Sequence, residues 1–579
     1  MKRNGILSPR RLWCAAAFCA FALAIAWTHG AAWRAGAREA VPRSRAADAA
    51  AAASKAWENT GLADATFATW LVGRNAHTLL RRPWNLFDTE HCAPGEKTMT
   101  RGEPMISLGL LGAPAALWTD DPILIYNWAL VALALVSAFA MYLLVSAWTG
   151  APAAGIAAGL FYAFHPIKLH SMAHAFIQDT GWTVLALFFA HRLFARGRWW
   201  DALGLGASTA LQMGASFYPF LAAVFLAPPF ALWLLFHYRL RNVKLAQLLF
   251  VGAVAALAAW IVFGPYLEAR SGGELLRRAN QIYAPWSSYL PGHAAFPGWV
   301  AIPFIAAALF AHRARALRGL DGDPRWAIVV GALLVALAAA GGNMYARMMA
   351  IAGQAPPPLP IPNLYALVGS VLPGLDSVRA VDKLKGGVHV AASILLGLGI
   401  AAAIRRAPVR WGGAVAAAAV LAVALDVLRP AALGLPPRIA YVSERIRPDP
   451  SALAFFEELA AGANDGPILE LPFERTTIHA IAHAPGRILL SGYHHRRTSA
   501  CFASYMGDRG EIAEIVERLP ARAALFDLQR LGFTTLLVHA GTPKAASLRA
   551  AFDAEAASPA GALARIQASP ALSAYAIGR

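Results

Sequence analysis

The sequence predicts an α-helical polytopic membrane protein of about eleven transmembrane helices with a C-terminal extracytoplasmic α/β domain. Two observations carry this prediction. Of the 579 residues, 58% are hydrophobic and only 15% are charged, and the mean hydropathy is +0.47. The formal charge of +18 is gathered in short basic clusters between apolar segments, as orientation signals are. We therefore expect membrane lipids rather than nucleic acid as the partner of this charge.

The first apolar segment, residues 12–27, follows a basic N-terminus and precedes no clear small-residue cleavage site. This favours an uncleaved helix with a cytoplasmic N-terminus over a signal peptide. Hydropathy predicts ten further spans, several of them shorter than the roughly 17–25 residues that a bilayer requires. They are residues 122–148, 151–164, 176–194, 200–216, 218–237, 245–266, 298–311, 326–341, 388–404 and 414–428.

The loop charges agree with this topology. Counted from a cytoplasmic N-terminus, four of the loops predicted inside contain a short basic cluster, as the positive-inside rule requires. These clusters are Arg192, Arg196 and Arg198; Arg239, Arg241 and Lys244; Arg313, Arg315, Arg318 and Arg325; and Arg405, Arg406 and Arg410. An odd number of spans then leaves the C-terminal region outside.

Four parts follow from this reading. Residues 1–33 form an N-terminal transmembrane helix, and residues 34–121 form a first extracytoplasmic loop with surface helices. Residues 122–428 form the multispan domain, and residues 429–579 the extracytoplasmic α/β domain. Within the first loop, residues 35–54 are expected to be helical or poorly ordered, and residues 105–118 to lie along the outer membrane surface.

After residue 429 the long apolar segments give way to shorter segments of alternating type. Helix-like segments at 450–461, 510–518, 523–531 and 545–556 alternate with β-rich runs at 468–473, 487–493 and 534–540. Such alternation predicts a small α/β domain with its own core, joined through a proline-rich linker at 435–437.

Acidic residues mark the first loop, and basic residues mark several later outer loops. Asp64 and Glu103 alternate with Trp, His and Arg beside apolar runs. Outer segments also contain basic residues where the positive-inside rule disfavours them, so they are functional candidates. These are Lys168 and His170 in HPIKLHSMAH, Arg270, Arg347, Arg379 and Lys383.

The four cysteines contain no CxxC motif, so they predict no zinc or redox site. Cys92 and Cys501 could meet in an oxidising compartment, but two unrelated buried thiols are the favoured interpretation.

The order of several segments resembles a known superfamily. These segments are DATFATWLVGRNAHTLL, RGEPMISLGLLGAPAALWTDDPILIYN, AWTGAPAAGIAAGLFYAFHPIKLHSMAH, SVRAVDKLKGGVHVAASILLGLGIAAAI, PILELPFE and SGYHHRR. They are similar to bacterial multispan proteins of the GT-C glycosyltransferase superfamily, including protein O-mannosyltransferase-like and aminoarabinose transferase-like enzymes. The resemblance covers nearly the whole chain and consists of pattern and order.

The resemblance implies a function and a location. Such proteins move a sugar from a polyprenyl-phosphate donor to a lipid, glycan or protein acceptor at the outer face of the bacterial inner membrane. The first-loop acid of the family falls on Asp64 and the second acid on Glu103. Asp64 has neither an acidic neighbour nor a DxD motif, so we assign no metal-binding residues. A requirement for a divalent cation is left as a possibility.

The chemistry gives each candidate a role. Asp64 would accept the acceptor's proton, and Glu103 would stabilise an oxocarbenium-like transition state. The departing lipid phosphate needs cations. Its candidate ligands are Arg379, Lys383, Arg347, Arg270, His170 and Lys168.

Structural alternatives stand beside these roles. Asp64 and Glu103 could mark helix starts, and Arg379 and Lys383 could anchor a span at the headgroups. SGYHHRR, residues 491–497, is either a loop folded down on the membrane site or a solvated basic turn. For the whole chain, the rivals are a lipid- or polysaccharide-transporting protein and a non-catalytic scaffold.

Overall fold

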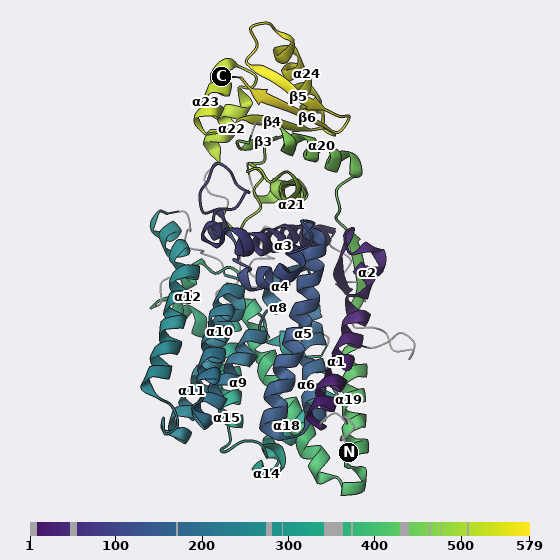
Figure 1. The fold of residues 1–579 in the computed structure, drawn as a ribbon, viewed down its shortest axis with the longest axis vertical. Coiled ribbons are helices and arrows are strands. Elements are labelled where there is room, and N and C mark those ends of the chain that lie inside the picture. Colours follow the sequence, from purple (N-terminus) through teal and green to yellow (C-terminus); the bar gives the residue numbers. More distant parts are fainter. Residues whose placement is uncertain are drawn as a thin grey trace, which may run out of the picture.

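The computed structural model describes residues 9–46, 55–169, 172–273, 281–291, 293, 295–340, 363–371, 374–428, 439–462, 465–475, 477–505 and 509–578. A helical bundle forms one end of the molecule, and a smaller α/β domain forms the other (Figure 1). The linker predicted at 435–437 lies outside the described residues.

Each of the eleven predicted spans is a helix. They are α1 (Pro9–Thr28), α5 (Pro122–Thr149), α6 (Pro152–Phe164), α9 (Gly181–Arg196), α10 (Trp199–Ala215), α11 (Phe217–Tyr238), α12 (Leu245–Ser271), α13 (Ala301–Phe310), α15 (Arg325–Ala339), α18 (Gly386–Arg406) and α19 (Gly412–Leu428). Six helical stretches of the described chain, which contain α1, α5, α11, α12, α18 and α19, are long and apolar enough to cross a membrane. The protein is therefore a helical membrane protein, and the count of eleven crossings stays a prediction.

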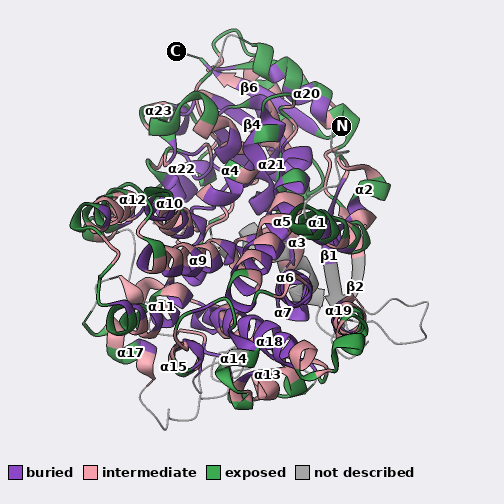
Figure 2. Cartoon of the chain, turned by 60° about the horizontal axis from the view of Figure 1, so that its bottom comes forward, coloured by how far each residue is buried: buried purple, intermediate pink, exposed green. Residues whose placement is uncertain are grey.

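Burial divides the bundle into a centre and a rim. In an apolar window of 18 residues, 78% of the residues are buried in the span that contains α18, whereas 11% are buried in α12. Figure 2 shows the same contrast, with α18 mostly buried and α12 exposed at the edge. Because the exposed residues of α12 are largely apolar, this helix faces the lipid.

The basic connections lie together at the end of the bundle opposite the α/β domain. The Arg405 guanidinium donates hydrogen bonds to the carbonyls of Thr149 and Arg315. Asn242 donates to the carbonyl of Ala195 at 3.0 Å, and α14 (Arg313–Ala316) lies at the same end (Figure 1). The basic loops therefore lie on one side of the bundle, and the assignment of that side to the cytoplasm stays a prediction.

Helix α3 (Lys55–Arg81) lies across the other end of the bundle, beneath the α/β domain (Figure 1). Asp64 lies well inside α3, so the interpretation of Asp64 as a helix cap is wrong. Helix α4 (Ile106–Ala116) follows and is largely buried within the protein, and its position at the outer membrane surface stays a prediction. Small residues permit this burial: a Cβ added to Gly109 would lie 2.5 Å from the Cβ of Asn75 in α3.

Two segments that are far apart in the sequence form a two-stranded antiparallel sheet. Strand β1 (Ala40–Ala46) pairs with β2 (Ile439–Arg445) along its whole length. The expectation that 35–54 is helical or poorly ordered is therefore wrong for β1. A strand partner about 400 residues away is not visible in a local pattern.

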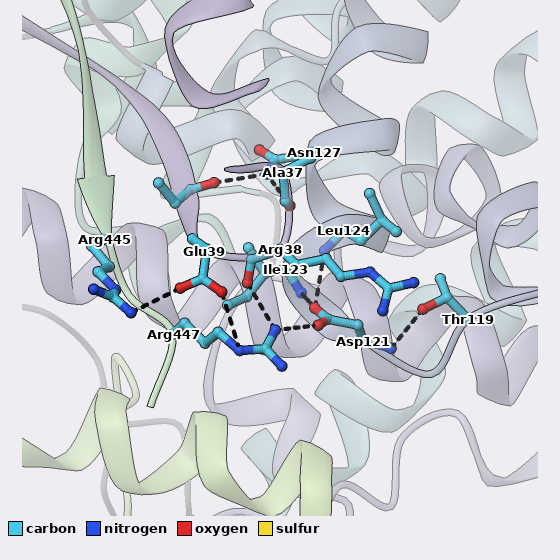
Figure 3. Close-up of polar contacts among 11 residues, drawn as sticks. Ala37, Arg38, Glu39, Thr119, Asp121, Ile123, Leu124, Asn127, Arg445 and Arg447 are labelled. Carbon is cyan, nitrogen blue, oxygen red and sulfur yellow. Dashed lines mark hydrogen bonds and ion pairs between the residues drawn. The ribbon is translucent and has the colours of Figure 1, made fainter. Parts of the chain in front are cut away.

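A network of charged side chains connects the segment just after β2 to the bundle (Figure 3). The Arg447 guanidinium lies 2.8 Å from the Asp121 carboxylate and 3.5 Å from that of Glu39. Asp121 is also the N-cap of α5, where its other oxygen accepts from the backbone N–H groups of Ile123 and Leu124. Arg447 therefore connects the start of the α/β domain to both the first loop and α5.

The α/β domain contains a four-stranded sheet in the order β3-β4-β6-β5. Strands β3 (Ile468–Leu471) and β4 (Thr535–His539) are parallel, and β6 (Leu572–Ile577) pairs antiparallel with β4 and β5 (Leu563–Ala568). Helices α20 (Pro450–Ala461), α22 (Gly510–Glu517), α23 (Arg522–Arg530) and α24 (Pro543–Ala557) confirm the helix predictions.

One predicted strand of this domain is a helix. Residues 487–493 belong to α21 (Thr477–His494), where Ile488 and Leu489 are buried in one apolar cluster with Trp70 of α3. Packing on α3 decides the structure over the strand propensity of the local sequence. Strands β5 and β6 were not predicted, because β5 is mostly exposed and lacks an apolar run.

We expect Arg447→Ala to lower the free energy of unfolding by about 1–3 kcal/mol, since Asp121 and Glu39 lose a shared, partly buried cation. Thermal unfolding in a fixed detergent measures the change. Arg445→Ala is the matched control, because the Arg445 side chain is 72% exposed and exposed ion pairs contribute little. Equal transitions for the two variants would contradict the proposed connection.

Candidate functional site

A cavity of about 330 Å³ lies where the first loop, α11, α12 and the α/β domain meet. The loop after η3 (Thr98–Arg101) supplies Glu103, and η6 (Leu375–Ser377) and the residues after it supply a second polar side. The chemically informative lining residues are Arg101, Glu103, Phe217, Phe220, Phe263, Tyr266, Arg270, Arg379 and Tyr505. The cavity therefore joins one carboxylate and three guanidinium groups to an apolar wall.

Glu103 is held in place from the start of α11. One carboxylate oxygen accepts a hydrogen bond from the Ser216 hydroxyl at 2.6 Å and another from the Phe217 N–H at 2.9 Å. Burial raises the pKa of Glu103, although these two donors and the charge of Arg379 oppose the rise. The side chain thus has a fixed orientation and a pKa above the usual glutamate value.

Two arginines have different surroundings. Arg270 is 2.9 Å from Asp376 and donates to the Ser377 hydroxyl at 2.6 Å, so its guanidinium is anchored. The Nε of Arg379 is buried and has no hydrogen-bond partner among the described residues. An unsatisfied buried donor next to a cavity can be satisfied by an anionic ligand.

The opposite side of the cavity is aromatic. Phe217 stacks with Phe263 at 5.8 Å between ring centroids, and Phe220 lies 5.1 Å from the same ring. Tyr266 meets Phe217 edge-on at 4.7 Å and donates its hydroxyl proton to the carbonyl of Gly102 at 2.8 Å. The apolar wall is therefore fixed to the loop that holds Glu103.

Asp64 lies apart from this cavity and is paired with a histidine. Its carboxylate is 2.7 Å from the Nε2 of His174. The His174 ring contacts Phe176, which contacts Tyr218 on the cavity wall, with centroid distances of 5.9 and 6.3 Å. Two ring contacts thus separate the Asp64–His174 pair from the cavity.

The other predicted phosphate ligands lie elsewhere. Lys383 is 3.8 Å from Asp382. The Lys168 amine donates to the carbonyl of Gln178 at 2.7 Å and lies 4.1 Å from the centre of the Tyr162 ring. Arg347 and His170 lie outside the described residues. The structure thus brings together Glu103, Arg270 and Arg379 of the predicted set.

A disulfide joins Cys92 to Cys501, so the favoured interpretation of two unrelated thiols is wrong. The segment after α21 runs along the first loop, where the N–H groups of Cys92 and Ala93 donate to the carbonyls of Ala500 and Thr498, both at 2.9 Å. Within SGYHHRR, Arg497 donates to the carbonyls of Pro94 and Gly95. This motif is therefore folded down on the loop and is not a solvated turn.

The sequence did not single out Arg101 and Tyr505. Arg101 lies two residues before Glu103 in the RGEP segment, so its position in the sequence could have identified it as a site candidate. Tyr505 has no distinctive neighbours, and its place follows from the disulfide: its N–H donates to the carbonyl of Arg101 at 3.2 Å. Its hydroxyl donates to the carbonyl of Ser377 at 2.5 Å.

In the part of the chain that the structure describes, no group of three His, Cys, Asp or Glu side chains could hold a metal ion. The divalent cation left open by the sequence stays untested.

Comparison with known proteins gives a likeness to solved structures. No protein-family model matches the chain, and no curated protein matches it. A solved structure of the arabinofuranosyltransferase AftD from Mycobacteria aligns with 99% of this chain at 14% identity and a TM-score of 0.46. This chain spans 40% of that longer protein. Because a TM-score under 0.5 does not establish a shared fold, the function has to be argued from the residues of this chain.

We expect alkylation of the unreduced, denatured protein to label Cys14 and Cys19 only, because Cys92 and Cys501 are bonded to each other. Reduction before alkylation should add label at both. Peptide mass spectrometry measures the four sites, with Cys14 and Cys19, which are free and exposed, as internal controls. Label on Cys92 without reduction would contradict the disulfide.

Proposed function

We propose that this protein transfers a sugar from a polyprenyl-phosphate donor to an acceptor at the outer face of the membrane. The observation that carries the proposal is the single cavity in which Glu103 and three arginines meet the aromatic wall of α11 and α12. A donor of this class has the matching parts: a sugar, a phosphate and a long apolar chain.

The charges of the cavity suit a phosphodiester. The cavity lining contains the guanidinium groups of Arg101, Arg270 and Arg379 and the carboxylate of Glu103, and Asp376 pairs with Arg270. These five groups leave one net positive charge. A sugar linked to a lipid through one phosphate has one negative charge. The buried Nε of Arg379 gives that phosphate an unused donor at the point where negative charge grows during transfer.

The apolar wall gives the donor a path from the bilayer. Phe263 and Leu267 line the cavity on α12, and Trp260 and Leu257 on the same helix are 73% and 56% exposed. Since α12 faces the lipid, a carrier can enter from the side while its phosphate stays at headgroup depth.

The reaction assigns one role to each acid. The acceptor hydroxyl attacks the anomeric carbon, the bond between that carbon and the phosphate oxygen breaks, and the lipid phosphate leaves with the electron pair. Glu103 stabilises the positive charge of the transition state from within the cavity. Asp64, paired with His174, lies two ring contacts from this cavity, so the base role that the resemblance gives it requires an acceptor site that extends from the cavity to this pair. The superfamily resemblance of the first loop supports the same pair.

We expect Glu103→Gln and Asp64→Asn each to reduce transfer by about 10²–10⁴-fold, as loss of a positioned acid or base does. The assay uses purified protein with polyprenyl-phosphate sugars and measures sugar release or transfer. Glu268→Gln is the control, because the Glu268 side chain is 66% exposed near the same edge. Absence of sugar release or transfer by the folded wild-type protein with every such donor would favour a transporter or a scaffold, and a normal rate for Asp64→Asn would reject Asp64 as the base.

The raised pKa of Glu103 predicts a pH dependence. If the carboxylate form is active, the rate falls as the pH drops through this pKa, above the usual glutamate range. Ser216→Ala removes a donor to the charged form, so it should raise the pKa further and move the acid limb to higher pH. The pH–rate profile measures the shift, and Ser370→Ala, at an exposed position, is the control. A shift of the limb to lower pH is the opposite of what this role requires.

A further inference from the structure

We call the cavity that contains Glu103 the transfer site. A second cavity, of about 380 Å³, lies between α9, α10 and α11, and the transfer reaction gives it no role. Its lining is mostly apolar and contains three polar residues, Thr183, Thr209 and Gln212. Thr183 and Gln212 are paired, because the Gln212 amide oxygen accepts from the Thr183 hydroxyl at 2.6 Å and its nitrogen donates to the carbonyl of Asp179. The second cavity therefore presents a largely apolar surface.

Phe220 belongs to the linings of both cavities. Its ring lies against Phe263 on the side of the transfer site, and below it α11 presents Ala223, Ala227 and Ala231 to the second cavity. Residues four apart lie on one helical face, so these alanines form a strip of small side chains, the alanine floor, beside the bulkier lining residues Val224 and Phe230 of the same helix. An apolar chain that starts at the arginines can therefore continue past Phe220 along α11.

The second cavity is long. From Phe220 to Leu235, both on its lining, the rise of α11 is about 22 Å. The hydrocarbon core of a bilayer is about 30 Å thick, so one leaflet is about 15 Å. A chain that lies along this whole stretch therefore covers more depth than one leaflet provides.

We propose that the distal part of the donor's polyprenyl chain lies in this second cavity, and that the alanine floor of α11 sets the chain length that the protein prefers. This inference rests on the proposed function for the identity of the headgroup. Phe194 and Leu234 line the deep end, where bulky side chains replace the alanines. Each further isoprenoid unit gains buried apolar contact until that end is reached, and units beyond it gain none.

The first test measures occupancy in the wild-type protein. A polyprenyl phosphate without sugar and with a diazirine at its terminal isoprenoid is photolysed with the protein in nanodiscs, and adducts are mapped by mass spectrometry. Adducts on the inner halves of α9, α10 or α11 that unlabelled polyprenyl phosphate removes support the proposal. Adducts confined to α12, or equal competition by phosphatidylglycerol at the same mole fraction, overturn it.

The second test changes the floor. Ala231→Phe should lower the affinity for long-chain polyprenyl phosphates by about tenfold or more, which corresponds to about two buried methylene groups, and should leave the affinity for short chains unchanged. Ala256→Phe on the lipid-exposed face of α12 is the matched control. Retained short-chain binding shows that the variant is folded. Equal loss at every chain length, or no loss at any, overturns the proposal, and if Ala231→Phe does not fold, the mapped adducts alone decide.

These tests separate the inference from the proposed function. Specific adducts in a protein that transfers no sugar would reject the transferase and keep the lipid site. Transfer without adducts in α9, α10 or α11 would keep the transferase and reject this location for the chain.

Discussion

The bond between Cys92 and Cys501 joins two segments that are 409 positions apart in sequence. One of these segments leads to Arg101 and Glu103, and the other leads to Tyr505. Without this crosslink the two segments would be connected through the whole membrane bundle, and bringing them together would cost the entropy of closing a very long loop. The outer wall of the transfer cavity depends on this link and on the backbone hydrogen bonds beside it.

A second constraint is electrostatic. A carboxylate and three guanidinium groups in one partly buried cavity are costly unless each has a partner. Ser216 and the Phe217 N–H orient Glu103, and Asp376 holds Arg270, so the cavity is preorganised before any substrate arrives. Among the described residues, the buried Nε of Arg379 has no hydrogen-bond partner, and it lies where the proposed phosphate would bind. Preorganised charge of this kind is the usual source of transition-state stabilisation.

The sequence predicted the helices well because each has its own hydrophobic run, and all eleven predicted spans are helical. It failed where distant contacts decide: residues 487–493 are helical because they pack on α3, and β1 forms because β2 reaches it from the far end of the bundle. Glu103, Arg270 and Arg379 were selected by charge and loop position. Tyr505 could not be selected, and the pairing of Cys92 with Cys501 could be named but not favoured, since both depend on the α/β domain lying on the first loop.

Helix α12 forms one wall of the transfer cavity, yet it packs on the rest of the protein along one side only. The remaining support comes from the bilayer, so lateral pressure and hydrocarbon thickness act directly on the width of the cavity. Detergent replaces this support with a softer surface. The lipid around the protein is therefore a structural component of the site, and measurements in micelles and in native-like membranes describe two mechanically different cavities.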